Sequence, residues 1–331
     1  MLELDKIYCM DALEGLQSIE DDTIDCIITD PPYNINKASW DRIDDYCNWF
    51  TSWVKECNRI LKGNGTFWFF HMDFDMLSKI HNSIVSNTSF RHKQLIIIDK
   101  GKQSIAGRSS LDLLRSYPRA TEYLQFYTFE DLTGAIQLSD TYARINPMSK
   151  YLRDEFKKAS VSCIEVAGNC GFYRNVNHGG MVSNWLSGNS NPSKEQYLKM
   201  RKYLNNEYLR KEYEYLRKEY DDLRKEYDDL RYTFNLQRGY TDVWKINFYK
   251  EKKNGHCTQK PLKLMRMIIR SATRKGDVIL DPFIGSGSTM LACRQLERSF
   301  IGFENNKDYY NISLKRLLNN PNRLENWIEV N

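Results

Sequence analysis

The sequence lacks any run of apolar residues long enough to span a bilayer, so a membrane-spanning helix is not expected. Its first residues, MLELDKIYCMD, carry charges where a secretory signal peptide needs an apolar core. A CxxC pair is also missing, because the eight cysteines are scattered along the chain. This spacing fits neither a zinc site nor a disulfide framework, and it predicts a protein of a reducing compartment, the cytoplasm, without a metal site.

Charge of one sign does not dominate the sequence either, since 48 basic and 43 acidic residues leave a formal net charge of +5 at pH 7. Such a balance permits a polyanionic partner without requiring one. Hydrophobic residues make up 41% and aromatic residues 13% of the 331 residues. These fractions indicate a globular protein with a sizeable core rather than a disordered chain.

Short apolar stretches alternate with helical patterns at both ends of the chain. Between the first two stretches, apolar residues recur at helical spacing from Trp49 to Leu61, and Gly63 and Gly65 are expected to end this helix. Apolar strands joined by amphipathic helices predict a parallel sheet covered on both faces. The expected strands are 24–30, 65–71, 94–99, 120–128, 277–281 and 300–304, with further helices at 261–275, 287–295 and from 305 onward.

The middle of the chain contains a seven-residue repeat, EYLRKEY, EYLRKEY, DDLRKEY, DDLRYTF. Its leucines fall seven residues apart, and an aromatic residue follows each leucine by four, which predicts a heptad helix over 207–234. Two interpretations stay open. The helix could pack its apolar stripe on its own domain, or it could pair two chains into a homodimer through a coiled coil.

The stretch IDCIITDPPYNI ends a predicted buried strand on an acid and two prolines. In a parallel sheet, ligands bind at the carboxyl ends of the strands, which puts Asp30 at the lip of a crevice. Pro31 and Pro32 fix φ and carry no N–H, so the turn is stiff and displays its carbonyl groups without competing donors. Tyr33 adds a flat aromatic face. Two acceptors and a ring suit a planar heterocycle that bears an amino group.

A second strand end lies in VILDPFIGSGSTMLA, where Asp281 precedes a glycine-rich loop and a helix. Gly285 and Gly287 let a ligand approach the backbone closely. The loop is neither a Walker loop nor a GxGxxG motif. In FIGFENN, Glu304 ends the next strand, at the position that takes ribose hydroxyls in nucleoside-binding α/β folds. This half of the sequence therefore favours a nucleoside cofactor.

Together, DPPY, DPFIGSGST, GFE and HCTQKP resemble the motifs of the S-adenosylmethionine-dependent amino-methyltransferases of DNA, in the order of the β class. The resemblance implies an α/β fold with a Rossmann-like, doubly wound, mostly parallel sheet in circularly permuted methyltransferase order. A mainly helical recognition region would be inserted into it. We therefore expect a catalytic half at 1–129, a target-recognition insertion at 130–245 and a cofactor-binding half at 246–331.

The resemblance also implies a role for each matching residue. Asp30 and the carbonyl of Pro31, followed by Pro32, would accept hydrogen bonds from the amino group of a flipped base, and Tyr33 would stack on its ring. S-adenosylmethionine would contact Asp11 and Ala12 with its adenine and Glu304 with its ribose. The other cofactor-binding residues implied are His256, Thr258, Gln259, Lys260, Asp281, Pro282, Phe283, Gly285, Ser286, Gly287, Ser288 and Asn305. His256 could instead cap the loop before a helix.

The aspartate before the prolines implies that the target is N6 of adenine in double-stranded DNA, since related enzymes that act on N4 of cytosine usually carry serine there. The family further implies a cognate restriction endonuclease as a partner. Three alternatives stay open: methylation of cytosine N4, methylation of RNA or of a protein amide, and an inactive DNA-binding coiled-coil protein.

Overall fold

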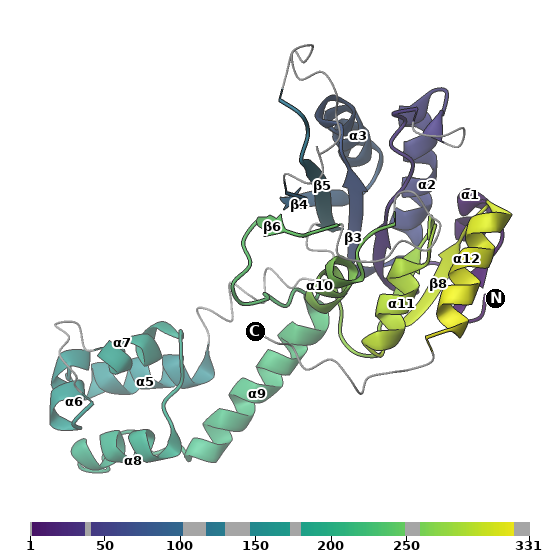
Figure 1. The fold of residues 1–331 in the computed structure, drawn as a ribbon. Helices are drawn as coiled ribbons and strands as arrows, with labels where there is room; N and C mark the ends of the chain where they lie inside the picture. The colour runs from purple at the N-terminus through teal and green to yellow at the C-terminus, as the bar shows by residue number, and fades with distance from the viewer. Residues whose placement is uncertain are drawn as a thin grey trace. The chain divides into compact units, whose positions relative to one another are not determined.

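The computed structural model describes residues 2–36, 41–101, 117–129, 146–172, 180–248 and 259–320, with the backbone alone at 227–230. The chain divides into two compact units (Figure 1). The first unit combines Met1–Leu132 with Tyr232–Asn331, and the second is formed by Thr133–Arg231. Each unit has hydrophobic core residues of its own.

Eight described strands form one sheet in the first unit, in the order β1-β8-β7-β2-β3-β5-β4-β6. Strand β5 is antiparallel to both of its neighbours, and the other neighbouring strands pair in parallel. This confirms the predicted mostly parallel α/β sheet. The strands are β1 (Lys6–Tyr8), β2 (Ile24–Thr29), β3 (Leu61–His71), β4 (Phe90–Asp99), β5 (Thr121–Phe129), β6 (Val243–Lys245), β7 (Val278–Asp281) and β8 (Ser299–Phe303).

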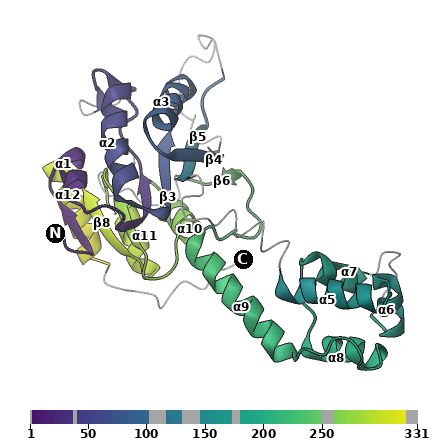
Figure 2. The same ribbon diagram turned by 180° about the vertical axis from the view of Figure 1, so that it is seen from behind.

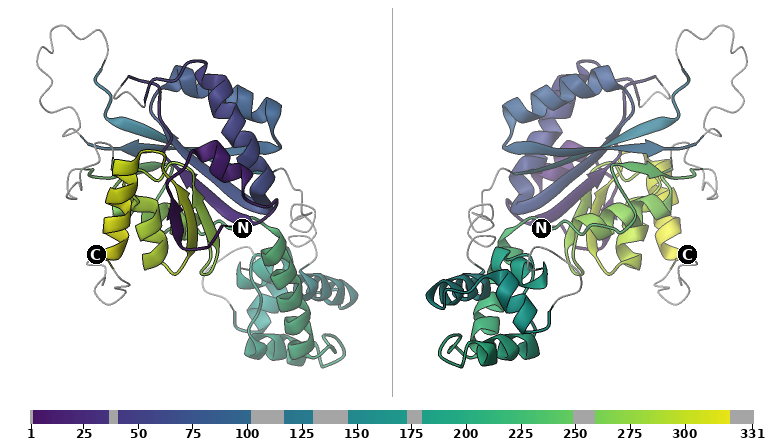
Figure 3. Two further views of the ribbon diagram at one scale, coloured as in Figure 1. Left: turned by 90° about the vertical axis from the view of Figure 1, so that its right-hand side faces the viewer. Right: turned by 90° about the vertical axis from the view of Figure 1, so that its left-hand side faces the viewer.

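Helices cover both faces of this sheet (Figure 3). One hydrophobic cluster packs against α1, α2 and α3, and the other against α10, α11 and α12. Strand β2 shows the reason: Cys26 and Ile28 are buried in one cluster and Ile27 in the other, as a continuous apolar strand requires. The helices are α1 (Ala12–Gln17), α2 (Tyr46–Ile60), α3 (Phe74–Asn87), α10 (Leu262–Ala272), α11 (Ser288–Gln295) and α12 (Lys307–Leu318).

The described part of the second unit is helical (Figure 2). Local signals set two of its helix starts, since Asn146 caps a helix that begins with Pro147, and Ser193 forms a capping box with Gln196. None of the helices in the described ranges is long and apolar enough to cross a membrane. The helices are α5 (Pro147–Lys158), α6 (Cys163–Asn169), α7 (Gly180–Ser187), α8 (Lys194–Tyr203) and α9 (Tyr213–Leu230).

The heptad helix predicted over 207–234 is wrong at both ends, because α9 starts later and ends earlier. Leu209 has a left-handed backbone with φ at 54°, and its N–H donates to Oε2 of Glu155 at 2.9 Å. Leu209 and Leu216 are fully buried in the core of their own unit. For these two leucines, the structure supports the interpretation in which the stripe packs on its own domain, while the homodimer stays a prediction.

The insertion expected at 130–245 is longer than the second unit, because its last part belongs to the first unit. The ring of Phe234 stacks on that of Phe126, with centroids 5.8 Å apart, and β6 pairs in parallel with β4. Gly63 and Gly65, expected to end a helix, lie inside β3, which directly follows α2. Helix α2 therefore ends where the backbone becomes extended at the start of β3, and neither glycine ends it.

Candidate active site

The acids at three neighbouring strand ends line one cavity. Strand β2 pairs in parallel with β7, and β7 with β8, so Asp30, Asp281 and Glu304 come at the same edge of the sheet. A hydrogen bond from Oγ1 of Thr29 to Oδ1 of Asp281, 2.8 Å long, joins the first two strand ends. All three acids line a cavity of about 550 Å³. The two motifs, far apart in the sequence, therefore share a single cleft.

Most of the predicted site residues line this cavity. Ala12, Pro282 and Gly287 are described but do not line it. His256 and Thr258 lie outside the described residues. The predicted residues that line the cavity are Asp11, Asp30, Pro31, Pro32, Tyr33, Gln259, Lys260, Asp281, Phe283, Gly285, Ser286, Ser288, Glu304 and Asn305.

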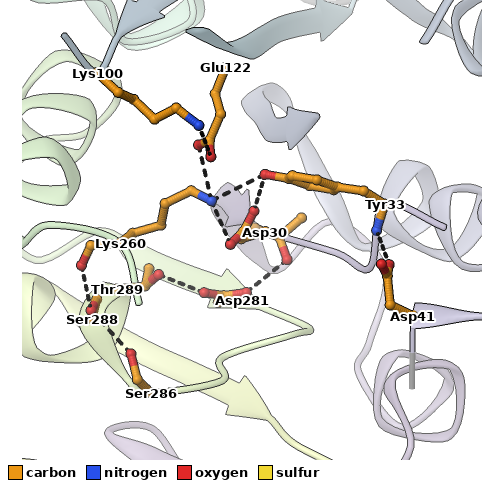
Figure 4. Close-up of polar contacts among 11 residues, drawn as sticks. Asp30, Tyr33, Asp41, Lys100, Glu122, Lys260, Asp281, Ser286, Ser288 and Thr289 are labelled. Atoms are coloured by element: carbon orange, nitrogen blue, oxygen red, sulfur yellow. Dashed lines mark hydrogen bonds and ion pairs between the residues drawn. The ribbon is translucent and has the colours of Figure 1, made fainter. Parts of the chain in front are cut away.

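A buried carboxylate holds the turn after β2 in place. Asp41 accepts hydrogen bonds from the backbone N–H groups of Tyr33 at 2.8 Å, Asn34 at 2.7 Å and Ile35 at 3.1 Å. The hydroxyl of Tyr46, on α2, donates to the carbonyl of Pro32 at 2.6 Å. Figure 4 shows the contact between Asp41 and Tyr33. These contacts fix the direction of the strand end. No motif in the sequence indicates Asp41, whose signal is an acid shortly after a turn rich in backbone donors.

Asp281 is a buried acid with three donors around it. It accepts hydrogen bonds from Oγ1 of Thr29, from Oγ1 of Thr289 at 2.6 Å and from the N–H of Phe283 at 3.1 Å. Burial nevertheless raises the pKa of Asp281 to about 7, because removal from water disfavours the charged form more than these donors favour it. This carboxyl therefore changes its charge near neutral pH.

The glycine-rich loop is tied to the end of β8. The two carboxylate oxygens of Glu304 accept from the N–H groups of Gly285 and Asn306, each at 2.9 Å, and burial raises the pKa of this carboxyl. Gly287 has φ at +74°, and a Cβ there would lie 2.9 Å from Cβ of Ser313. Glycine is thus required at this position both by the backbone conformation and by close packing against α12.

Asp11 lies at the same cavity and begins a helix. Its Oδ1 accepts from the N–H of Leu13 at 2.8 Å and caps α1, which leaves the second carboxylate oxygen without that bond. Ala12 is buried behind it. Of the two residues predicted at the start of α1, Asp11 therefore lines the cavity, whereas Ala12 is buried and does not line it.

Lys260 contacts the residues expected to bind the target amine, although the resemblance assigns it to the cofactor (Figure 4). Its Nζ donates to Oδ2 of Asp30 at 2.7 Å and to the hydroxyl of Tyr33 at 3.1 Å. The Tyr33 hydroxyl donates in turn to Oδ1 of Asp30 at 2.5 Å. Both oxygens of Asp30 therefore have a donor. Burial and the Asp30 carboxylate raise the pKa of Tyr33 well above its ordinary value, so it stays a phenol.

Glu122, which no motif indicated, extends this chain of charges from β5. Its Oε2 lies 3.3 Å from Nζ of Lys260, and its Oε1 lies 3.1 Å from Nζ of Lys100. Burial acts to raise the pKa of Glu122, but the two ammonium groups outweigh it and leave that pKa below its ordinary value. The available signal was an acid inside the apolar stretch TEYLQFYTF, since an unpaired carboxylate is costly to bury.

The cavity fits a nucleoside-bearing cofactor at the glycine-rich side. Its volume of about 550 Å³ lies within the range of roughly 300–1,000 Å³ that small-molecule sites have. Glu304 supplies a carboxylate at a strand end, and Gly285, which has no side chain, lines the cavity in the loop before α11. Trp49, Phe283 and Ile284 add apolar surface, as the flat parts of such a ligand require.

Comparison with known proteins agrees with this geometry. The family model for DNA methylases of the N6/N4 type matches residues 24–315, which include both strand-end motifs. The Type II methyltransferase M.HpaI of Haemophilus parainfluenzae is 24% identical over 94% of this chain and 74% of its own length. Two solved structures share the fold.

The first, the M1.HpyAVI–SAM complex, has a TM-score of 0.52 at 21% identity and covers 94% of this chain and 98% of its own. The second, the PvuII DNA methyltransferase (cytosine-N4-specific), has a TM-score of 0.56 at 14% identity and covers 97% of this chain and 88% of its own. Since the family match spans most of the sequence and both halves of the cavity, the chain belongs to the N6/N4 family of S-adenosylmethionine-dependent DNA methylases.

Proposed function

We propose that this protein is a site-specific DNA methyltransferase that transfers a methyl group from S-adenosylmethionine to the N6 amino group of adenine in duplex DNA. The observation that carries the proposal is the shared cavity, in which the Asp30 turn faces the Asp281 loop. One side offers acceptors for an amino group, and the other offers an acid and a glycine-rich loop for a nucleoside. A reaction between two bound molecules requires such an arrangement.

On the cofactor side, Glu304 would hold the ribose hydroxyls, and Asp281 with the loop of Gly285 and Ser286 would surround the methionine half. Asp11 would contact the adenine. When bound, S-adenosylmethionine supplies a methyl group made electrophilic by its positively charged sulfur. The apolar surface of Trp49 and Phe283, which line the cavity, would exclude water from this side once the cofactor is bound and so strengthen the polar contacts within it.

On the amine side, Asp30 and the carbonyl of Pro31 would accept hydrogen bonds from the two amino hydrogens of the base. The lone pair of an exocyclic amine is delocalised into the ring, and these two acceptors favour a pyramidal nitrogen that keeps its lone pair. Asp30 is also placed to receive the proton that this nitrogen loses. Because Asp41 and Tyr46 hold the turn rigidly, the acceptors are oriented before the base arrives.

The target atom is unreachable inside a duplex, so the base would be flipped out of the helix into the cavity. We assign sequence recognition to the second unit, whose described residues form helices around their own core. A cognate restriction endonuclease would recognise the same DNA sequence. Two leucines of the heptad stripe, Leu209 and Leu216, are buried in the core of this unit. Pairing of two chains would therefore depend on the rest of the stripe.

Cytosine N4 is the second candidate target, since the fold is shared with a cytosine-N4-specific enzyme. Asp30 before the prolines favours adenine instead, because the N4 enzymes that the motif resembles usually carry serine there. Incubation of the purified protein with methyl-labelled S-adenosylmethionine and either unmethylated bacterial genomic DNA or total RNA, followed by mass spectrometry of the nucleosides, distinguishes the two. We expect labelled N6-methyladenine in DNA and no label in RNA. N4-methylcytosine, or methylation of RNA alone, would overturn the assignment.

The affinity for S-adenosylmethionine is expected to fall as the pH is lowered through about 7, the pKa to which burial raises Asp281. Protonation of Asp281 removes the negative charge that attracts the cationic methionine half of the cofactor. Below this pH, binding must therefore also displace the proton from Asp281. The Kd measured by calorimetry from about pH 8 to about pH 6 should rise towards tenfold per pH unit on the acid side. In Asp281→Asn the Kd should be higher than in wild type and nearly independent of pH. A wild-type Kd that does not change with pH would contradict the prediction.

A further inference from the structure

In the proposed reaction, the amino group of the base and Lys260 compete for the same carboxylate. The ammonium of Lys260 lies 2.7 Å from Oδ2 of Asp30, and the Tyr33 hydroxyl lies 2.5 Å from the other oxygen. The amine must come equally close to one of these oxygens to donate a hydrogen bond. A carboxylate oxygen can accept two hydrogen bonds, but the ammonium at 2.7 Å weakens Asp30 both as an acceptor for the amine and as a base for the proton that the amine loses (Figure 4). Withdrawal of Lys260 would therefore make Asp30 a stronger partner for the entering base.

Lys260 has a second carboxylate within reach. Oε2 of Glu122 lies 3.3 Å from its Nζ, longer than the roughly 2.7–2.9 Å typical of a charge-assisted hydrogen bond. A small movement of the ammonium away from Asp30 would shorten this contact. Lys100 holds the other oxygen of Glu122 at 3.1 Å, so the accepting carboxylate is itself fixed. The ring of Phe70, 4.7 Å from Nζ, adds a cation–π contact on the same ammonium.

The side chain of Lys260 is 7% exposed, and that of Glu122 is 10% exposed. A buried ammonium that lost its last carboxylate would be strongly destabilised, because water could not replace the lost partner. With Glu122 present, the withdrawal of Lys260 from Asp30 exchanges one ion pair for another. Without Glu122, the same withdrawal would leave the charge uncompensated among the described residues.

We infer that Lys260 is an exchangeable partner of Asp30, and that Glu122 is the positioning residue that retains Lys260 when the flipped base enters. The inference rests on the proposed function. Lys260 neutralises Asp30 before the base enters and moves to Glu122 when the amine arrives. In this role Glu122 acts through Lys260.

Glu122→Gln tests this inference because it keeps the size of the side chain and removes its charge. Turnover is measured with S-adenosylmethionine labelled in the methyl group and unmethylated bacterial genomic DNA, which contains every recognition sequence. We expect kcat/KM for DNA to fall at least tenfold, since Asp30 becomes the remaining carboxylate partner of Lys260. The Kd for S-adenosylmethionine should stay within twofold of wild type. Glu297→Gln, which removes an exposed ion pair with Lys275, is the matched control and should retain full turnover.

Two further variants separate this role from a merely structural one. Glu122→Asp keeps the charge and should recover most of the turnover that Glu122→Gln loses. In a Lys260→Met background, which removes the ammonium, the added Glu122→Gln should change turnover less than twofold, because nothing is left to be retained. Equal effects of Glu122→Gln in both backgrounds, or complete loss of turnover in a Lys260→Met protein that still binds the cofactor, would overturn the inference.

The wild-type protein separates failure of the inference from failure of the proposed function. Wild-type protein that binds S-adenosylmethionine and leaves all DNA unmethylated contradicts the proposed function itself. Wild-type protein that methylates DNA at the same rate as Glu122→Gln contradicts the inference alone.

Discussion

Asp30→Ala is expected to lower kcat for methyl transfer to DNA roughly 1,000-fold, the upper range for loss of one oriented catalytic group. The variant removes one of the two acceptors that would localise the lone pair of the target amine, and the carbonyl of Pro31 alone cannot replace it. S-adenosylmethionine should still bind, because the loop after Asp281 does not depend on this side chain. Lys260 keeps Glu122 as a partner, so the fold should persist.

The control for this experiment lies on the same strand. Asp25, near the other end of β2, pairs with Lys62 at 2.6 Å and accepts from the N–H of Val278 at 2.9 Å. Asp25→Ala therefore removes the same charge and an ion pair of similar length, with a more exposed lysine and away from the cavity. It should lower the thermal stability while kcat stays near the wild-type value. Ordinary turnover by Asp30→Ala, in an assay where Asp25→Ala is also active, would disprove the role of Asp30.

The sheet could be predicted from the sequence wherever strands are apolar on both faces. Cys26, Ile27 and Ile28 lie in such a stretch, and β2, β7 and β8 were found within one residue of their observed ends. The strands β1 and β6 are not predictable, because three residues give too short a pattern. The heptad repeat predicts a longer helix than α9, since it continues through Leu209, whose backbone is left-handed and whose side chain is buried. Tertiary packing there overrides a local pattern.

The candidate site was predictable where a motif lies at a strand end. Asp30, Asp281 and Glu304 were found in this way, and their meeting in one cavity follows from the strand order. The contacts between side chains were not predictable. Lys260 lies far from Asp30 in the sequence, and Glu122 comes from an antiparallel strand that carries no motif. Such pairings depend on the lateral order of the strands, which the local pattern does not contain.

Asp41→Ala is expected to reduce kcat about 100-fold through the position of the turn alone, since misplacement of reacting groups by about 1 Å has effects of that size. Asp41 is 1% exposed, and its carboxylate accepts from three consecutive backbone N–H groups that begin at Tyr33. Each hydrogen bond to a charged acceptor contributes about 1.5–3 kcal/mol, so its loss leaves this turn free to change direction. Cofactor affinity should change much less than turnover.

Two substitutions make this prediction specific. Asp41→Asn keeps one acceptor oxygen but turns an amide donor toward backbone donors, so its turnover should fall between those of wild type and Asp41→Ala. Asp44→Ala, three positions along and exposed, removes the same charge without reaching the turn and should leave turnover unchanged. Turnover measured on genomic DNA and thermal unfolding are compared for all three. Wild-type kcat in Asp41→Ala would show that the Asp41 carboxylate does not orient Asp30 and the carbonyl of Pro31.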